Sequence, residues 1–280
     1  MSRIALIYNN KSPEGKELLL QVASHVKAKG GDIVSGGDIP GFRVDRLKNG
    51  DFSTASAAIV FGGDGTMLTA VRHLAPMDIP LFGINMGKVG FLSSAEKDEA
   101  FHATERLLAG DYTIHKRMLI KCQLHRQEKI ILECQAFNDF VVSSGVYSRA
   151  VNLELTVDGS PIHSYNADGV IVSTPTGSTG YSLSAGGPIV MANMDMLLIT
   201  PVCAHSFFSR PIIASAESTV GIICYGAEDK ASLTADGQYR ISLCPGDKAF
   251  ISREEKKANI IEFDNQASFF DRIKNKLYSL

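Results

Sequence analysis

The chain has 280 residues, of which 45% are hydrophobic and 21% are charged, and its formal net charge at pH 7 is -2. This length allows two domains with separate cores, and the composition is that of a soluble globular protein. A net charge so close to zero gives no basis for binding nucleic acid or an anionic membrane surface.

The five cysteines, at positions 122, 134, 203, 224 and 244, form no C-x-x-C pair and are odd in number. Such scattered cysteines favour a reducing compartment and argue against a disulfide framework or a structural zinc site. The N-terminus enters a strand-like run without a signal peptide, and no apolar run is long enough to span a membrane. We therefore expect a cytoplasmic protein.

Alternating strand and helix patterns in the first part of the chain predict an α/β domain. Three continuous apolar runs are typical of strands buried on both faces, at residues 4–8, 57–61 and 79–85. Apolar residues at helical spacing predict helices over residues 14–29 and 67–74, and residues 32–52 are expected to be loop with at most a short strand. This alternation predicts an open, mostly parallel sheet.

A glycine-rich turn, Gly62-Gly63-Asp64-Gly65-Thr66, lies between a predicted strand and a predicted helix. Its glycines let the backbone approach a ligand closely, and N–H groups at a helix start can bind phosphate oxygens. A carboxylate would repel such an anion, so Asp64 suggests a proton acceptor for an attacking hydroxyl or a group that helps hold a cation. The alternative is a structural turn in which Asp64 caps the helix.

After a helix predicted over about residues 97–109, the pattern changes to many short strands separated by turns. The predicted strands cover residues 118–124, 130–134, 138–142, 153–157, 170–173, 197–200, 220–224, 233–235, 241–243, 249–252 and 259–262. Asp158-Gly159 and Asp236-Gly237 have the chemistry of hairpin turns. Together they predict an all-β second domain, a layered sandwich-like fold.

The chain is therefore divided into an α/β domain of residues 1–96, a β-rich domain of residues 97–264 and a C-terminal helix within residues 265–280. The last helix has an apolar side, which needs either the first domain or a neighbouring subunit to cover it.

The densest polar stretch runs from Asp168 to Pro188. An acidic turn leads into a buried strand, which opens into a loop with six Ser or Thr residues and Tyr181. Hydroxyls in such number can bind ribose, phosphate or carboxamide groups, and Tyr181 can face a heterocycle. The alternative is an ordinary solvated loop, but the apolar strand before it and the Gly-Gly-Pro sequence after it favour a ligand site.

Other polar residues carry weaker signals. Asn138-Asp139 on a predicted strand places one polar side chain on its inward face, where a ligand or a protein group must satisfy it. His205 and Arg210 are compatible with structural roles. The sequence contains no Ser/His/Asp triad pattern, no H-E-x-x-H and no Walker A motif, so those hydrolase, zincin and P-loop classes are not favoured.

Taken together, these motifs resemble the NAD kinase family over nearly the whole chain and in the expected order. The matching stretches are Gly62 to Thr66 (GGDGT), residues 85–92 (N-x-G-x-x-G-F-L), Asn138-Asp139 (an Asn-Glu pair in the family), residues 168–188 (DGxxxSTPTGSTAYxxSxGGP) and residues 200–211 (TPxxxHxxxxRP). GGDGT also occurs in diacylglycerol and sphingosine kinases and, more loosely, in phosphofructokinases, so residues 168–188 are the most specific match.

The resemblance implies transfer of a γ-phosphoryl group from ATP, or polyphosphate in some members, to the 2′-hydroxyl of the adenosine ribose of NAD. It implies Asp64 as general base and a phosphate cradle of Gly62, Gly63, Gly65 and Thr66. It also implies NAD binding, with help from a second subunit, by Asp64, Gly65, Asn138, Asp139, Asn166, Asp168, Thr179, Gly180, Tyr181, Ser182, Leu183, Ser184, Cys203 and Gln238.

Three residues depart from the family pattern: Asp139 replaces Glu, Gly180 replaces Ala and Asn166 replaces Arg. The sequence has no carboxylate cluster that would build a protein metal cage, so Mg²⁺ or Mn²⁺ is expected to arrive on the ATP phosphates. The resemblance also leads us to expect a homo-oligomer, either a dimer or a tetramer.

Two other functions remain open at this point. A lipid kinase of the diacylglycerol type would share the GGDGT turn, although the sequence has no basic amphipathic membrane face. A non-catalytic dinucleotide sensor would bind NAD but form no NADP with Mg-ATP.

Overall fold

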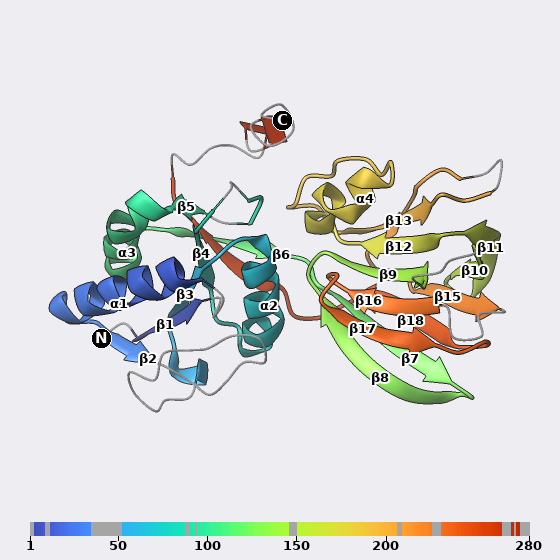
Figure 1. Cartoon of the computed structure of the whole chain (residues 1–280), viewed down its shortest axis with the longest axis horizontal. Helices are drawn as coiled ribbons and strands as arrows, with labels where there is room; N and C mark the ends of the chain where they lie inside the picture. Colours follow the sequence, from blue (N-terminus) through green and yellow to red (C-terminus); the bar gives the residue numbers. More distant parts are fainter. Residues whose placement is uncertain are drawn as a thin grey trace. The chain divides into compact units, whose positions relative to one another are not determined.

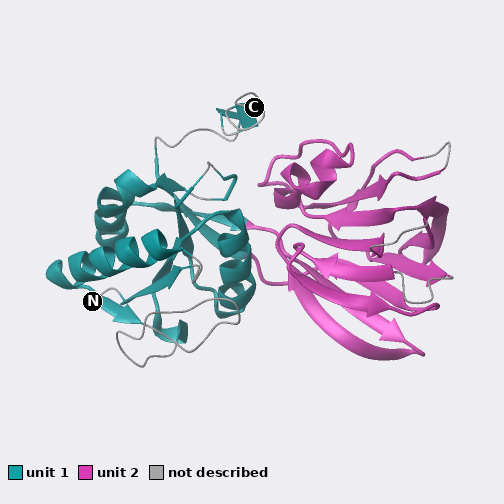
Figure 2. Ribbon diagram, in the orientation of Figure 1, with its two compact units in different colours: residues 1–116, 258–280 teal, residues 117–257 magenta. Residues whose placement is uncertain are grey.

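Residues 3–8, 12–34, 52–87, 90–92, 94–145, 150–205, 209–225, 231–264, 270–271 and 273–274 are described in the computed structural model of the chain. The chain divides into two units (Figure 2). Unit 1 comprises Met1–Lys116 and Ala258–Leu280, and unit 2 comprises Arg117–Lys257. This division differs from the predicted boundaries at residues 96 and 264, because the helix after residue 96 and the strand near residue 260 both join unit 1.

Unit 1 is built around a seven-stranded sheet with the order β2-β1-β3-β4-β19-β6, in which β5 also pairs with β4. The pairings of β1 with β2 and β3, and of β4 with β3, β5 and β19, are parallel. This confirms the predicted mostly parallel sheet. The strands are β1 (Arg3–Tyr8), β2 (Asp32–Val34), β3 (Ala57–Phe61), β4 (Leu81–Asn85), β5 (Ala95–Glu96), β6 (Thr113–Arg117) and β19 (Ala258–Glu262).

Helices cover both faces of this sheet (Figure 1). Apolar residues of α1 (Pro13–Ala28) and α3 (Ala100–Ala109) share one buried cluster with the strands. In contrast, α2 (Asp64–Leu74) adds no residue to that cluster and contacts β3 and β4. Short 3-10 helices complete the unit: η1 (Phe52–Thr54), η2 (Ala75–Met77) and η3 (Lys97–Glu99).

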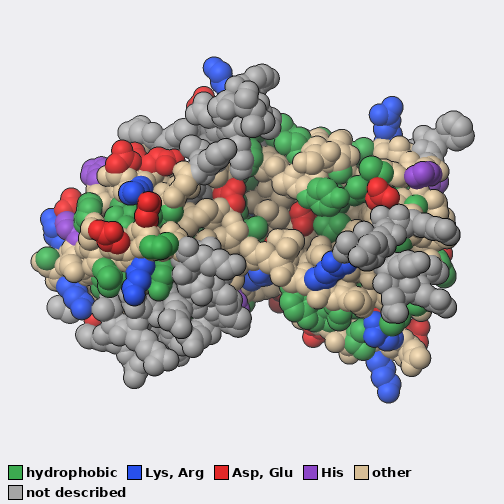
Figure 3. Space-filling model, viewed as in Figure 1, with side chains coloured by type: hydrophobic (Ala, Val, Ile, Leu, Met, Phe, Trp, Pro, Cys, Tyr) green, Lys and Arg blue, Asp and Glu red, His purple; other side chains and the backbone are tan. Residues whose placement is uncertain are grey.

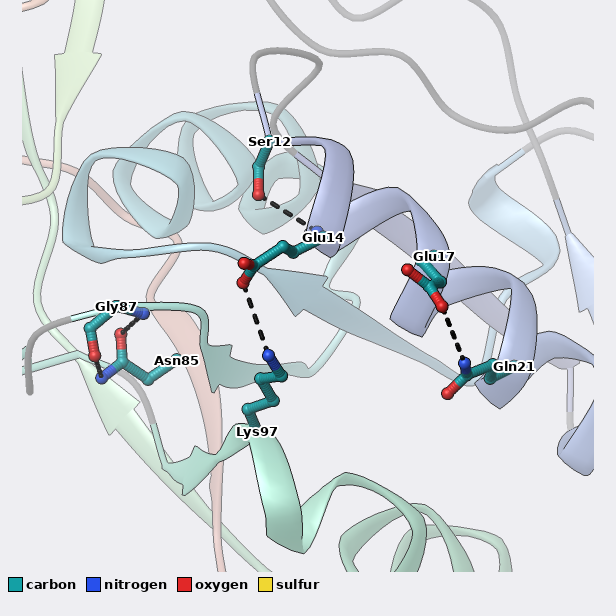
Figure 4. Close-up of polar contacts among 8 residues, drawn as sticks. Ser12, Glu14, Glu17, Gln21, Asn85, Gly87 and Lys97 are labelled. Carbon is teal, nitrogen blue, oxygen red and sulfur yellow. Dashed lines mark hydrogen bonds and ion pairs between the residues drawn. The ribbon is translucent and has the colours of Figure 1, made fainter.

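Local sequence explains where α1 begins and ends. The Ser12 hydroxyl accepts a hydrogen bond from the Gly15 N–H at 3.1 Å, and a proline follows at the first helical position (Figure 4). Both features favour a helix start. After the helix, Gly30 adopts a φ of 80°, the left-handed conformation that commonly ends helices.

Unit 2 is a sandwich of two six-stranded antiparallel sheets, as predicted. One sheet has the order β14-β13-β12-β9-β16-β17 and the other β11-β10-β15-β18-β7-β8. A single large apolar cluster draws residues from both sheets and forms the core. The elements are β7 (Ile120–Arg126), β8 (Lys129–Ala136), β9 (Asp139–Ser144), β10 (Val151–Val157), β11 (Ser160–Ala167), β12 (Gly169–Ser173), η4 (Thr176–Thr179), α4 (Tyr181–Ser184), β13 (Met196–Val202), β14 (Ile212–Ser215), β15 (Val220–Tyr225), β16 (Ala231–Ala235), β17 (Tyr239–Leu243) and β18 (Lys248–Arg253).

Several elements differ from the sequence predictions. The strand predicted at residues 259–262 is β19, which pairs in parallel with β4 of unit 1 and so does not belong to the β-rich unit. Strands β5, β6, β11 and β14 were not predicted. Of the predicted loop over residues 32–52, the first residues form β2, and residues 35–51 lie outside the described residues.

The predicted C-terminal helix also lies mostly outside the described residues. Within the part of the chain that the structure describes, no helix is both long enough and apolar enough to cross a membrane.

Candidate active site

The glycine turn of unit 1 lies at the exposed start of α2. Strand β3 ends at Phe61, and α2 begins at Asp64 with Gly63 as its N-cap residue. Gly63 and Gly65 are exposed, whereas the Thr66 side chain is buried. The helix start therefore presents its backbone at the surface, where an anion can reach it. The N-cap residue is Gly63, which makes no side-chain cap hydrogen bond, so Asp64 is the first helical residue and not the N-cap residue.

The Asp64 carboxylate instead joins the two glycine motifs of unit 1. Its oxygens accept hydrogen bonds from the backbone N–H groups of Phe91 and Leu92, each at 3.1 Å. A methyl group at Gly90 would collide with this carboxylate, so the close approach requires glycine at that position. Two backbone donors on a neighbouring loop thus fix the orientation of a half-buried carboxylate at the helix start.

Asn85, at the end of β4, shapes the start of that loop. Its side chain donates to the Gly87 carbonyl at 3.0 Å and accepts from the Gly87 N–H at 3.3 Å (Figure 4). The Asn85 side chain is buried, and it lies within 3.5 Å of the Glu96 carboxylate as well. The asparagine of this motif therefore fixes the backbone at Gly87, just after β4.

In unit 2, the Asn138-Asp139 pair and the hydroxyl-rich loop lie together at one end of β9 and β12. The Asn138 carbonyl accepts from the Thr174 N–H at 2.8 Å, and the Thr174 hydroxyl donates to the Phe137 carbonyl at 2.6 Å. A methyl group at Gly180 would lie 3.7 Å from Asn138 Nδ2 and 3.9 Å from Asp139 Oδ2. The loop thus folds directly over the pair, although about 40 residues separate them in the sequence.

Most hydroxyls of this loop bond within the protein. The Thr179 hydroxyl donates to the Thr176 carbonyl, and the Ser182 hydroxyl shares a 2.8 Å bond with Thr200. Ser178 bonds to Val190 and to the Pro175 carbonyl. These hydroxyls build the loop, so a ligand would meet mainly its exposed groups.

The exposed groups of the loop include Tyr181, whose residue is 47% exposed, and Ser184. Leu183 is half-buried. Apolar side chains also reach the surface of unit 2 around α4 (Figure 3). Such a surface suits contact with the ring of a heterocycle.

Three buried polar atoms at this end of the sheet have no hydrogen-bond partner among the described residues: Asn138 Oδ1, Ser173 Oγ and Thr176 Oγ1. Ser173 is the direct cross-strand partner of Asp139, so their side chains lie on the same face of the sheet. Buried polar atoms are normally satisfied, and a ligand with donors and acceptors would satisfy these.

Asp139 is buried and lies beside a second carboxylate, that of Asp236. Burial and the negative charge of Asp236 raise the pKa of Asp139 from its ordinary value of 3.8 to about 7. Gln238, two residues after Asp236, is exposed in the turn between β16 and β17, where its N–H donates to the Ala235 carbonyl.

Asn166, Asp168 and Cys203 form a separate exposed group at the opposite end of β12. The Asp168 N–H donates to the Val202 carbonyl at 3.0 Å, and Asn166 donates to Asn152 at 2.7 Å. At about 3.3 Å per strand residue, this group lies roughly 16 Å along β12 from Asp139. The predicted NAD-binding residues of unit 2 therefore fall into two groups, one at each end of the strand.

Sequence reasoning did not identify Asp236 as a site residue. Asp236-Gly237 and Asp158-Gly159 have the same turn chemistry in the sequence, and only the three-dimensional structure separates them. Among the described residues, no group of three His, Cys, Asp or Glu side chains could hold a metal ion.

A glycine turn at the exposed start of a helix, on a parallel α/β unit followed by a β-sandwich with a hydroxyl-rich loop, suits a nucleotide-dependent phosphotransferase. Comparison with known proteins identifies the family within this class. Residues 33–112 match the ATP-NAD kinase N-terminal domain, and residues 137–263 match the ATP-NAD kinase C-terminal domain.

Individual relatives agree with these domain matches. The chain is 34% identical over 280 residues to the NAD kinase of Moorella thermoacetica, covering 99% of this chain and 89% of that protein. It is 40% identical over 223 residues to the NAD kinase of Natranaerobius thermophilus, covering 80% of this chain and 78% of that protein. The chain belongs to the NAD kinase family.

Solved structures show the same fold. An NAD kinase from Archaeoglobus fulgidus in complex with ATP superposes with a TM-score of 0.75 at 25% identity, covering 99% of each chain. Yeast NADH kinase complexed with NADH has a TM-score of 0.84 at 24% identity, covering all of this chain and 88% of that one.

Proposed function

We propose that this chain transfers the γ-phosphoryl group of ATP to the 2′-hydroxyl of the adenosine ribose of NAD and so forms NADP. One observation carries the proposal: the Asp64 carboxylate is held in one orientation at the exposed start of α2 by the N–H groups of Phe91 and Leu92. Family membership supports this activity over a lipid kinase, because the curated relatives are named NAD kinases.

Asp64 would accept the proton of the attacking ribose hydroxyl. A ribose hydroxyl is a poor acid, and a positioned carboxylate typically contributes about 10²–10⁴-fold to the rate of such a transfer. The glycine backbone of residues 62–65 would bind phosphate oxygens at the helix start. A divalent metal bound to the ATP phosphates would neutralise their charge, which leaves the protein mainly the tasks of positioning and proton acceptance.

NAD binding would use the group at the end of β9 and β12. Asp139 would accept hydrogen bonds from ribose hydroxyls, and the partnerless atoms of Asn138 and Thr176 would bond to polar groups of the dinucleotide. Tyr181 would contact a ring through its exposed face. Of the three departures from the family pattern, Asp139 shortens a carboxylate side chain, Gly180 removes a methyl group and Asn166 removes a cation. These changes alter the reach of the site but not its chemical type.

The second group, at Asn166, Asp168 and Cys203, supports a homo-oligomer. It lies roughly 16 Å from Asp139 along β12, and the family resemblance implies a site shared between subunits. We therefore propose that this group contacts an NAD molecule bound by a neighbouring copy. A fully active monomer, measured by light scattering at assay concentration, would contradict this part of the proposal.

The direct experiment is a coupled assay for NADP formed from NAD and Mg-ATP. The proposal predicts NADP formation that does not depend on liposomes, and a parallel assay with polyphosphate would identify the phosphoryl donor. Tight NAD binding without NADP formation would favour the sensor function, whereas liposome-dependent transfer to a lipid would favour a lipid kinase.

A further inference from the structure

The Asp236 carboxylate binds three consecutive backbone N–H groups at the start of β9. Its Oδ1 accepts from Phe137 at 3.1 Å, from Asn138 at 2.7 Å and from Asp139 at 3.2 Å. Its own backbone N–H donates to the Asp139 carbonyl at 2.9 Å. Asp236 is a buried residue, 8% exposed, although it belongs to a hairpin turn.

The same short segment is held from its other side by Thr174. The Thr174 hydroxyl donates to the Phe137 carbonyl, and the Thr174 N–H donates to the Asn138 carbonyl. Asp236 therefore binds the donors of residues 137–139 while Thr174 binds acceptors of the same segment. This arrangement fixes the backbone from which the Asn138 and Asp139 side chains project.

The other Asp-Gly turn of the chain provides an internal comparison. Asp158 and Asp236 both have a φ of 51°, and each is followed by a glycine with positive φ. However, Asp158 is exposed, and its carboxylate accepts from one backbone N–H, that of Thr219, at 2.8 Å. Turn formation alone needs only the Asp158 arrangement, so the buried three-donor site of Asp236 exceeds what a hairpin turn requires.

We propose that Asp236 is a positioning residue, whose carboxylate holds the backbone of residues 137–139 so that Asn138 and Asp139 face the dinucleotide site. This inference rests on the proposed function. Nothing in the motif comparison assigns a role to Asp236, and its position between β16 and β17 is about 100 residues from the pair that it holds.

The charge of Asp236 also acts on Asp139. Asp236 is the charged group that raises the pKa of Asp139 together with burial. Among the described residues, Asp236 is the one charged group that shifts the pKa of Asp139, and the neighbours on β12 and in the loop, Ser173 and Gly180, are uncharged. Removing the Asp236 charge should therefore lower the pKa of Asp139, and with it the pH at which its carboxylate becomes available to a ribose hydroxyl.

The test compares Asp236→Asn with the matched turn variant Asp158→Asn. Asparagine tolerates the left-handed backbone, so both variants should fold. For Asp236→Asn we expect the KM for NAD to rise about tenfold at pH 8.5, as expected for one weakened hydrogen bond. The KM for ATP should stay within about twofold, and Asp158→Asn should leave both values within about twofold.

A pH profile separates positioning from a purely structural role. In the wild type, kcat/KM for NAD should decline on the acid side near pH 7, and in Asp236→Asn this decline should move to lower pH. In an Asp139→Asn background, Asp236→Asn should no longer shift the pH of this decline, because that shift acts through the Asp139 carboxylate. The proposal would be overturned if the acid-side decline of kcat/KM stayed at the same pH in Asp236→Asn, or if the KM for NAD rose equally in the Asp158 and Asp236 variants.

Two measurements do not depend on turnover. Carboxyl ¹³C NMR of the wild type should show Asp139 titrating near pH 7, and a midpoint near its ordinary value would contradict the effect of the Asp236 charge on Asp139. NAD affinity measured by calorimetry should weaken in Asp236→Asn but not in Asp158→Asn. If the wild type formed no NADP, the proposed function would fail, while these two readouts would still test the role of Asp236.

Discussion

The two carboxylates on which the proposed site relies, Asp64 and Asp139, are held in contrasting ways. Asp64 is half-buried and accepts two backbone N–H groups at 3.1 Å. Burial, together with the negative charge of the nearby Asp236, raises the pKa of Asp139 to about 7. The difference teaches that one fold can fix the direction of one carboxylate and set the protonation of another. Substitutions at or near each carboxylate test the two halves of this contrast.

The largest effect is expected for Asp64→Asn. The amide removes the proton acceptor, so kcat should fall by roughly 10²-fold or more, while NAD affinity should stay within about tenfold. The amide nitrogen cannot accept from Phe91 or Leu92, so the free energy of unfolding should fall by about 1–3 kcal/mol without loss of the fold. Steady-state kinetics, calorimetry and thermal melting measure the three quantities. A near-wild-type kcat would end the assignment of Asp64 as base.

Gly90→Ala should displace the Asp64 carboxylate without removing its charge. The new methyl group would collide with that carboxylate, so kcat should fall by about tenfold or more because the base is misplaced. Gly87→Ala is the matched control in the same motif, since a methyl group there meets nothing within 4 Å. Equal kcat values for the two variants would show that the Asp64 orientation does not matter.

Tyr181 tests whether the loop binds the dinucleotide and not ATP alone. Thr179→Val combined with Tyr181→Ala should raise the KM for NAD by about five- to tenfold, as expected for a lost ring contact and a disturbed loop, and much less the KM for ATP. Tyr225→Ala is a control of similar exposure, 48%, on β15. Equal changes in both KM values would contradict this placement.

The smallest effect concerns stability and follows from Asp139. The folded protein keeps the Asp139 proton up to about pH 7, whereas the unfolded chain releases it near the ordinary value of 3.8. The folded state therefore binds more protons between these values, and the free energy of unfolding falls as pH rises through this window.

Asp139→Asn has no charge to bury, so it should lack this loss of stability. At pH 8 its Tm should exceed that of the wild type by a few degrees, since each kcal/mol corresponds to roughly 2–4 °C. Near pH 4 the two Tm values should match. Differential scanning calorimetry measures the difference, with the exposed Asp168→Asn as control. A Tm difference between the two proteins that does not change with pH would contradict the burial of Asp139 beside the charge of Asp236.

Local patterns predicted much of this molecule, and distant contacts account for what they missed. Apolar residues at helical spacing were enough to predict α1. In contrast, the strand at residues 259–262 was placed in the wrong domain, because Ile260 and Ile261 suit a buried strand in either sheet and only the pairing with β4 decides.

The site shows the same limit. The glycine turn at Asp64 was visible in the sequence, but its partners Phe91 and Leu92 lie 27 and 28 residues away. The hydroxyls of Thr179 and Ser182 suggested ligand contacts, yet they bond within the protein, since a tightly turned loop must satisfy its own backbone and buried side chains. Asp236 could not be distinguished from Asp158 without the fold.

The central claim, transfer to the 2′-hydroxyl of the adenosine ribose, is tested most directly with an NAD analogue that lacks only that hydroxyl. The wild-type protein would be incubated with Mg-ATP and either NAD or the 2′-deoxy analogue, and the products followed by ³¹P NMR. The account predicts NADP from NAD, no phosphorylated product from the analogue, and competitive inhibition of NAD by the analogue. Phosphorylation of the analogue, or no NADP from NAD, would contradict it.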